Sequence, residues 1–315
     1  MLKYYYSGAG IGLGNPNVEE IHRIISNCPN RLLSCHGEYT SFAIKWLNIA
    51  KEIGYKATIL LDSGAFTAWS RGAEVKLEEL IVAYDNMLNS YLPFNHEFYL
   101  INLDKIPGSP GRTADATEVD NCVRISDKNF EVLRKRYGER VLPVFHQNET
   151  EARLKEVVDM APYICISPRN DVPEKSRVTW SKEVHAKIPK GKWTHGLATT
   201  GMKMMNQVEW YSVDSAAWIF MTTTGSILLC LNGKLKMIGI SERSSARFEY
   251  DYHYRTVSEQ VRIEIDKRIE FHALTIERLN DNLNTRILIT ILETNYWLNN
   301  HHDFINNNYA GLFPL

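Results

Sequence analysis

The fold is indicated most clearly by the segment Ala57-Thr58-Ile59-Leu60-Leu61-Asp62-Ser63-Gly64-Ala65-Phe66. Its first five residues are apolar or β-branched and predict a short strand that is buried on both faces. The strand ends at Asp62, because an unpaired carboxylate inside a dry sheet is energetically costly. Gly64 lets the backbone approach a ligand closely, and Phe66 offers a flat apolar surface. Ligands bind at the carboxyl ends of parallel strands, so we predict that Asp62 lies in an active site.

Short apolar segments that end at polar residues recur along the chain, and segments with helical periodicity separate them. Strands are predicted at 3–7, 57–62, 96–103, 141–145, 163–166, 192–195, 210–213 and 226–231, and helices at 38–54, 77–91, 117–138 and 149–160. About eight alternations of strand and helix favour an α/β fold, a single (β/α)8 TIM barrel, over an open sheet. We assign 1–255 to the catalytic barrel domain and 256–315 to a C-terminal helical extension packed on the barrel.

The composition is that of a globular protein, since 44% hydrophobic residues allow a sizeable core. The 36 basic and 37 acidic residues give a net charge of −1, which argues against binding nucleic acid through overall charge and leaves a local basic face open. Five cysteines without a CxxC pair suit a reducing compartment. No signal peptide is apparent, and the longest uncharged stretch, 215–233, predicts a buried strand pair. We therefore expect a cytoplasmic protein with no membrane partner.

Several predicted strands end in residues that can take part in catalysis or ligand binding. These ends carry Asp62-Ser63-Gly64, Asp104, His146-Gln147, Gly196-Leu197-Ala198 and Asp214-Ser215. In a barrel they meet at one mouth, where neighbouring carboxylates raise one another's pKa values. A site can thus hold an acid/base beside an ionised nucleophile, the pair that substitution at the anomeric carbon of a sugar requires without a metal.

Simpler explanations exist for each of these residues. An aspartate before serine or glycine also suits a turn or a helix N-cap. Three acids that each end an apolar strand nevertheless favour one shared site. His146 and His36 lack a second ligand at helical or CxxC spacing, so hydrogen-bonding roles are favoured over metal binding. We expect neither a metal nor a cofactor.

Four blocks of sequence resemble motifs of the tRNA-guanine transglycosylases, in the same order and at similar spacing. Leu61–Phe66 is similar to the family's DSGG(F/Y) motif, and Gln147 stands where the family has the glutamine of VQG. His195–Ala198 resembles GGLA, and Val213–Ala217 resembles the FDSAS of archaeal members. The blocks span about 55–220, roughly half of the chain. The resemblance implies a TIM barrel that exchanges guanine for a 7-deazaguanine through a covalent sugar–enzyme intermediate.

The resemblance also implies roles for individual residues. Asp214 would be the nucleophile at C1′, and Asp62 would be the general acid/base. The base would be bound by Ser63, Phe66, Asp104, Gln147, Gly196, Leu197 and Met202. A carboxylate such as Asp104 can accept the N1–H and amino groups of guanine together, and a glutamine can donate to O6.

The chain departs from the family pattern after the barrel. Members that act on tRNA carry a CxCxxC zinc site there, whereas this chain has only Cys230 beyond residue 220. In addition, Ala65 replaces the second glycine of the DSGG motif. Small members without the zinc subdomain resemble phage-encoded DNA-guanine transglycosylases, which place 7-deazaguanines in viral DNA as a shield against restriction. We therefore expect DNA and a preQ0-type base as substrates. The alternatives are tRNA as substrate, a non-catalytic nucleic-acid-binding partner subunit, and a metal-free glycosidase or nucleosidase.

Either polymer would need cations to hold its backbone. The candidates are Lys190, Lys192, Arg243, Arg247 and Arg255. Aromatic residues interleave with the three arginines, a mixture that can stack on splayed bases and meet phosphates. The basic run at 134–140 is better explained as a solvated helix face.

Overall fold

The computed structural model describes residues 1–8, 17–244 and 252–302. Nine parallel strand segments form one sheet in the order β5-β4-β3-β2-β1-β9-β8-β7-β6. They are β1 (Lys3–Tyr6), β2 (Asn30–Ser34), β3 (Thr58–Asp62), β4 (Glu97–Ile101), β5 (Val141–Leu142), β6 (Val144–His146), β7 (Tyr163–Ser167), β8 (Trp193–Gly196) and β9 (Ser212–Ser215).

The sheet curls into a nearly closed barrel because the two segments at its ends are parts of one strand. Only Pro143 separates β5, which pairs with β4, from β6, which pairs with β7. A proline cannot donate a ladder hydrogen bond, but its carbonyl still accepts one from the Cys165 N–H at 2.8 Å. With β5 and β6 taken together, the nine segments make eight strands. The predicted α/β barrel with a C-terminal helical region is therefore confirmed.

One barrel strand differs from the prediction. The sequence reasoning missed β2, in which only Leu32 and Leu33 are apolar between polar neighbours, too short a run to stand out. The segment predicted at 226–231 is indeed a strand, β10 (Ser226–Leu231), but it lies outside the barrel sheet. It pairs antiparallel with β11 (Lys234–Gly239) in a separate hairpin.

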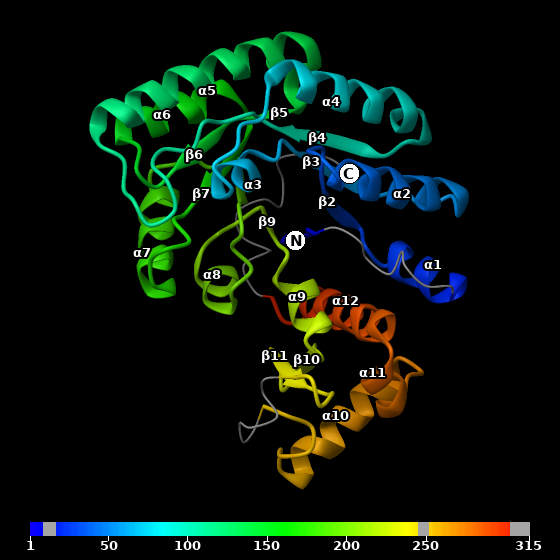
Figure 1. The fold of residues 1–315 in the computed structure, drawn as a ribbon. Helices are drawn as coiled ribbons and strands as arrows, with labels where there is room; N and C mark the ends of the chain where they lie inside the picture. The colour runs from blue at the N-terminus through cyan, green and yellow to red at the C-terminus, as the bar shows by residue number, and fades with distance from the viewer. Residues whose placement is uncertain (9–16, 245–251, 303–315) are drawn as a thin grey trace.

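Helices cover the outside of the barrel (Figure 1). They are α1 (Val18–Ser26), α2 (Tyr39–Glu52), α3 (Ala65–Ser70), α4 (Leu77–Tyr91), α5 (Ala116–Tyr137), α6 (Glu151–Met160), α7 (Glu174–His185), α8 (Met202–Gln207) and α9 (Ala217–Thr223), with short 3-10 turns at Leu92–Phe94 and Gly138–Arg140. Local chemistry fixes several helix starts. Asp115 accepts from the Glu118 N–H ahead of α5, and Thr150 accepts from the Arg153 N–H ahead of α6.

The C-terminal helices form a smaller body with a core of its own. They are α10 (Glu259–Phe271), α11 (Ile276–Asp281) and α12 (Leu283–Asn300). The hairpin contributes Ile227, Leu229 and Ile238 to this second core, together with Ile265 and Ile269 of α10. The hairpin belongs to the predicted barrel domain by residue number, but it shares this core with the helices. The boundary after residue 255 stays a prediction.

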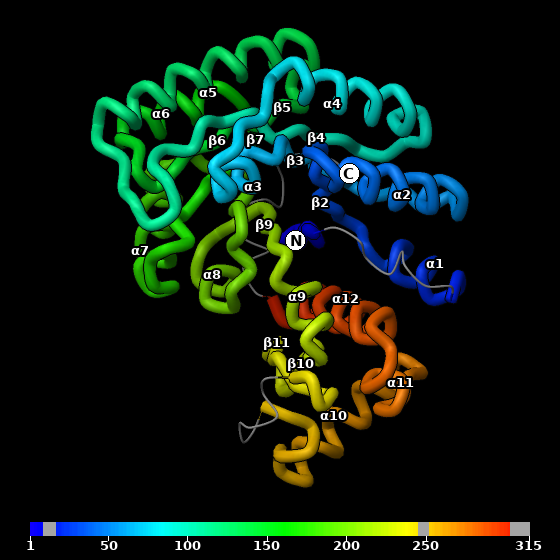
Figure 2. Tube along the Cα trace, viewed as in Figure 1, coloured from blue at the N-terminus to red at the C-terminus, as the bar shows by residue number. Residues whose placement is uncertain are grey.

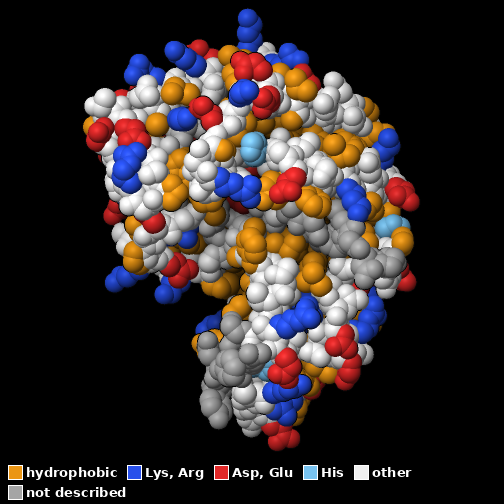
Figure 3. All heavy atoms as spheres, in the orientation of Figure 1, with side chains coloured by type: hydrophobic (Ala, Val, Ile, Leu, Met, Phe, Trp, Pro, Cys, Tyr) orange, Lys and Arg blue, Asp and Glu red, His pale blue; other side chains and the backbone are white. Residues whose placement is uncertain are grey.

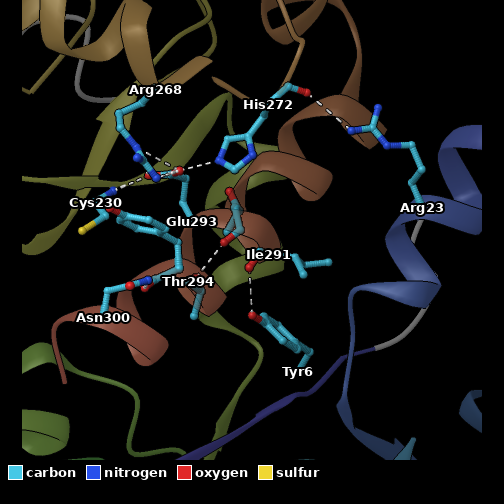
Figure 4. A network of polar contacts seen from close by, with 11 residues as sticks. Tyr6, Arg23, Cys230, Arg268, His272, Ile291, Glu293, Thr294 and Asn300 are labelled. Atoms are coloured by element: carbon cyan, nitrogen blue, oxygen red, sulfur yellow. Dashed lines mark hydrogen bonds and ion pairs between the residues drawn. The ribbon is translucent and has the colours of Figure 1, made fainter. Parts of the chain in front are cut away.

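α12 returns to the barrel and lies beside α9 (Figure 2). The Tyr6 hydroxyl on β1 donates to the Ile291 carbonyl at 3.2 Å (Figure 4). It also lies 2.8 Å from Asn295 Oδ1. Thr285 Oγ1 donates to Glu20 Oε1 on α1 at 2.6 Å. These contacts pack the helical extension on the barrel. Within the described ranges, no helix is both long enough and apolar enough to cross a bilayer.

Candidate active site

The barrel mouth holds a cavity of about 400 Å³, a size typical of sites for small molecules. Residues on a strand alternate between the barrel interior and the outer helices. In β6, Val144 packs inside, Phe145 packs outside, and His146 points inside again. Every strand contributes one such residue at or just past its carboxyl end, and together they line the cavity: Ser7, Ser34, Asp62, Asp104, His146, Ser167, Leu197 and Asp214.

Five of the predicted site residues therefore meet in one place. They are Asp62, Asp104 and Asp214, with Leu197 and Phe66. The three acids come from β3, from the segment just after β4 and from β9, and 152 residues separate the first from the last. Their convergence follows from the closed parallel sheet, which brings every strand end to the same rim.

Asp62 is the carboxyl whose protonation is most changed by this arrangement. Burial and the negative charges of Asp214 and Asp104 raise its pKa to about 7, although Oδ2 accepts a hydrogen bond from the Gly64 N–H. Gly64 is needed here, because its φ is +81° and an added Cβ would lie 2.2 Å from the His36 Cβ. Asp62 can therefore both give and take a proton near neutral pH.

Asp104 is held by an ion pair inside the cavity. His146 Nε2 lies 2.7 Å from Asp104 Oδ2. Burial alone would lower the pKa of His146, but the hydrogen bond and the charge of Asp104 outweigh it, so the pKa is raised. The raised pKa favours the imidazolium form of His146, whose positive charge partly offsets the negative charge of Asp104.

Asp214 accepts from the loop that follows β8. Its Oδ1 receives the Ala198 N–H at 3.1 Å, and Ala198 has a positive φ of 53°. Gly196 permits this turn, since an added Cβ would lie 2.2 Å from Thr199 Oγ1, which donates to the Gly196 carbonyl. His195 Nε2 is 3.3 Å from Asp214 Oδ1, close enough for an ion pair but not aligned as a hydrogen bond.

Four predicted base-binding residues do not line the cavity. Gln147 Oε1 accepts from the Arg169 N–H at 2.8 Å, and Ser63 Oγ accepts from the Ala65 N–H. Gly196 shapes the turn beneath Asp214, and Met202 begins α8 and packs against the main core. His146, one residue before Gln147, faces the cavity instead. The strand alternation in Val144-Phe145-His146 is the signal that identifies it.

Other features of the mouth escaped the sequence reasoning. Ser7, Ser34 and Ser167 add hydroxyl groups to the lining. Aromatic side chains also line the cavity while staying exposed to solvent: Phe42 at 37%, Phe66 at 53% and Phe220 at 67%. Only Phe66 was predicted. The two others lie on α2 and α9, whose approach to the mouth no local pattern reveals.

The predicted cations are scattered. Lys190 and Lys192 precede β8 and so lie at the amino end of the barrel, opposite the mouth, where Lys192 Nζ donates to the Ala161 carbonyl. Arg243 is exposed beyond the hairpin, and Arg255 pairs with Glu242. Arg247 lies outside the described residues. Figure 3 shows basic and acidic side chains interspersed over this face of the barrel, with hydrophobic ones gathered between the barrel and the smaller C-terminal body.

No group of three or more His, Cys, Asp or Glu side chains is arranged to hold a metal ion within 1–8, 17–244 and 252–302. Comparison with protein-family models gives no match, and neither does a search of curated proteins. The acid-lined mouth is therefore the feature from which a function can be proposed.

Proposed function

We propose that the protein is a DNA-guanine transglycosylase, a pentosyltransferase that exchanges guanine in DNA for a 7-deazaguanine base of the preQ0 type. The observation that supports this most is the pairing of Asp62 and Asp214 in one cavity, with the pKa of Asp62 raised to about 7. Base exchange needs a carboxylate that attacks the sugar and a second group that carries a proton in both directions. Asp214 and Asp62 fill these two roles.

In the first half of the reaction, a carboxylate oxygen of Asp214 bonds to C1′ as the bond from C1′ to the guanine nitrogen breaks. Protonated Asp62 gives its proton to the departing guanine. In the second half, ionised Asp62 takes a proton from the entering base, whose nitrogen bonds to C1′ and releases Asp214. The negative charge of the cavity stabilises the cationic character that the sugar develops in both transition states.

The other residues of the mouth select and hold the base. Asp104, fixed by His146 through Oδ2, presents Oδ1 to the N1–H and amino donors of guanine. Phe66, half-exposed on α3, stacks on the base. The target nucleotide leaves its stack to reach the acids, while its phosphates stay outside the negatively charged cavity.

The test is incubation of the protein with radiolabelled guanine or preQ0 and either DNA or tRNA. Label that enters DNA and is absent from tRNA is the expected result. Label in tRNA alone would keep the chemistry and replace the substrate. Label in neither polymer, from folded protein over a range of pH, would overturn the proposal and favour a non-catalytic nucleic-acid-binding subunit.

A second candidate is a nucleosidase that releases the base to water. Among the described residues that line the cavity, the only lysine or arginine is Arg31, which donates to the carbonyls of Tyr6 and Gly8. A mouth with few cations suits a substrate without phosphates. Free base released from a nucleoside, with no label transferred to any polymer, would favour this candidate.

A further inference from the structure

A chain of buried polar groups runs from Asp214 into the barrel interior. His195 Nε2 is 3.3 Å from Asp214 Oδ1, and His195 Nδ1 is 2.7 Å from Ser212 Oγ. Ser212 Oγ is in turn 2.6 Å from the Tyr163 hydroxyl. His195 and Ser212 are fully buried, and Tyr163 is nearly so. Barrel interiors are usually packed with branched apolar residues, so this set of polar groups beneath a carboxylate needs an explanation.

The numbers of donors and acceptors determine the direction of the hydrogen bonds between Tyr163, Ser212 and His195. If Tyr163 donates to Ser212, Ser212 donates to His195 Nδ1, and each hydroxyl hydrogen has an acceptor. In the reverse direction Ser212 would donate to Tyr163, and Tyr163 would donate to the neighbouring Tyr5 hydroxyl. The hydrogen of the buried Tyr5 hydroxyl would then have no acceptor among the described contacts. With Nδ1 as acceptor, the neutral imidazole carries its hydrogen on Nε2, the nitrogen that lies 3.3 Å from Asp214 Oδ1.

We propose that His195 is a positioning residue for Asp214 in the proposed base exchange, held in its Nε2–H tautomer by Ser212 and Tyr163. This inference rests on the proposed function. The Ala198 N–H and the His195 Nε2–H then both face Oδ1, which leaves Oδ2 as the oxygen that bonds to C1′. The His195 contact is unaligned in the free protein, and such contacts commonly tighten when substrate binds.

The tautomer can be measured without any activity. Nitrogen-15 NMR of histidine-labelled protein, with the His195 signals assigned by comparison with His195→Gln, should show a neutral ring with hydrogen on Nε2. A ring with hydrogen on Nδ1, or a doubly protonated ring at neutral pH, would overturn the inference. This measurement decides the arrangement even if the protein transfers no base, an outcome that would count against the proposed function alone.

Steady-state kinetics distinguish a role of His195 in positioning Asp214 from a role in packing alone. Ser212→Ala removes the donor to Nδ1, so we expect kcat for label transfer to fall at least about tenfold with KM for DNA changed by less than twofold. Tyr163→Phe leaves the serine hydroxyl in place and should cost about twofold. Ser181→Ala, a fully buried serine on α7 away from the mouth, is the matched control and should leave kcat unchanged.

Two results would contradict the positioning role. One is an unchanged kcat in Ser212→Ala. The other is a loss of kcat in Ser212→Ala that Ser181→Ala shows equally, with the same fall in melting temperature. In the expected case the wild type and Tyr163→Phe share one His195 tautomer, and Ser212→Ala shifts it.

Discussion

Glu293 in the C-terminal body and Asp62 at the barrel mouth are both carboxylates removed from bulk water, but their surroundings differ. Glu293 is fully buried on α12 and receives hydrogen bonds from Arg268, from the His272 ring and, at 2.8 Å, from the Cys230 N–H (Figure 4). Burial alone would raise its pKa, but these donors outweigh burial and lower it. Asp62 has two other acids as neighbours and a raised pKa.

The difference indicates that the charge of Glu293 stabilises the fold, whereas the carboxyl of Asp62 is available for proton transfer. Donors from α10 and β10 surround Glu293, so its charge joins α12 to both elements. At the mouth the three acids receive hydrogen bonds from the Gly64 N–H, from His146 and from the Ala198 N–H, but their like charges lie close together. In the proposed reaction this negative field would act on a bound sugar and on a proton.

Asp214→Asn should abolish label transfer, with a loss of at least about 1000-fold, because the amide cannot form the bond to C1′. Mass spectrometry should show the covalent sugar adduct with the wild type and not with the variant. The melting temperature should stay the same or rise. Asp120→Asn, an exposed acid on α5, is the control. A variant that still exchanges bases would show that Asp214 is not the nucleophile.

Glu293→Ala should destabilise the fold by about 3–5 kcal/mol, because the partly buried Arg268, the His272 ring and the Cys230 N–H all lose their partner. Urea unfolding followed by circular dichroism measures the loss. Glu270→Ala on the exposed side of α10 should change stability by less than about 0.5 kcal/mol. A similar small effect for both variants would mean that the C-terminal network contributes no more than a surface charge.

Asp62→Asn should raise stability above neutral pH and have little effect near pH 4. The folded pKa of about 7 exceeds the ordinary 3.8, so the folded protein binds the extra proton and the wild type loses stability as pH rises between these values. The gain at pH 8 should be about 1–2 kcal/mol after screening by water in the cavity.

Glu293 should behave in the opposite sense, which makes the comparison sharp. Its lowered pKa means that its stabilisation is present above the ordinary 4.5 and is lost as pH falls below it. Melting temperatures of the wild type, Asp62→Asn and Glu293→Ala from about pH 2 to 8 separate the two. An identical pH dependence for wild type and Asp62→Asn would contradict the raised pKa of Asp62.

His146→Ala should lower label transfer about tenfold, because Asp104 loses the partner that fixes it. Gln147→Ala, one residue later and facing away from the cavity, should change transfer by less than twofold. Steady-state rates for the two variants are the measurement. The reverse order of effects would return the base-binding role to Gln147.

Much of the barrel could be predicted because its signals are local. The apolar run before Asp62 and the similar runs before Asp104 and Asp214 identify buried strands that end in acids. The same reasoning could have placed His146 inside and Lys192 at the far end, since both follow from strand alternation and strand direction. β2 could not be predicted, because its two leucines are too few to mark a strand without their neighbours in the sheet.

The alternation of strand and helix and the acids at the strand ends follow from the sequence alone, because side-chain period and strand polarity are properties of short segments. Which of these charges are compensated depends on the folded arrangement of the chain. His195 meets Ser212 through the register of β8 against β9, and His146 meets Asp104 across 42 residues of chain. Such pairings depend on how distant strands align, and hydrogen bonding and charge at the mouth depend on them.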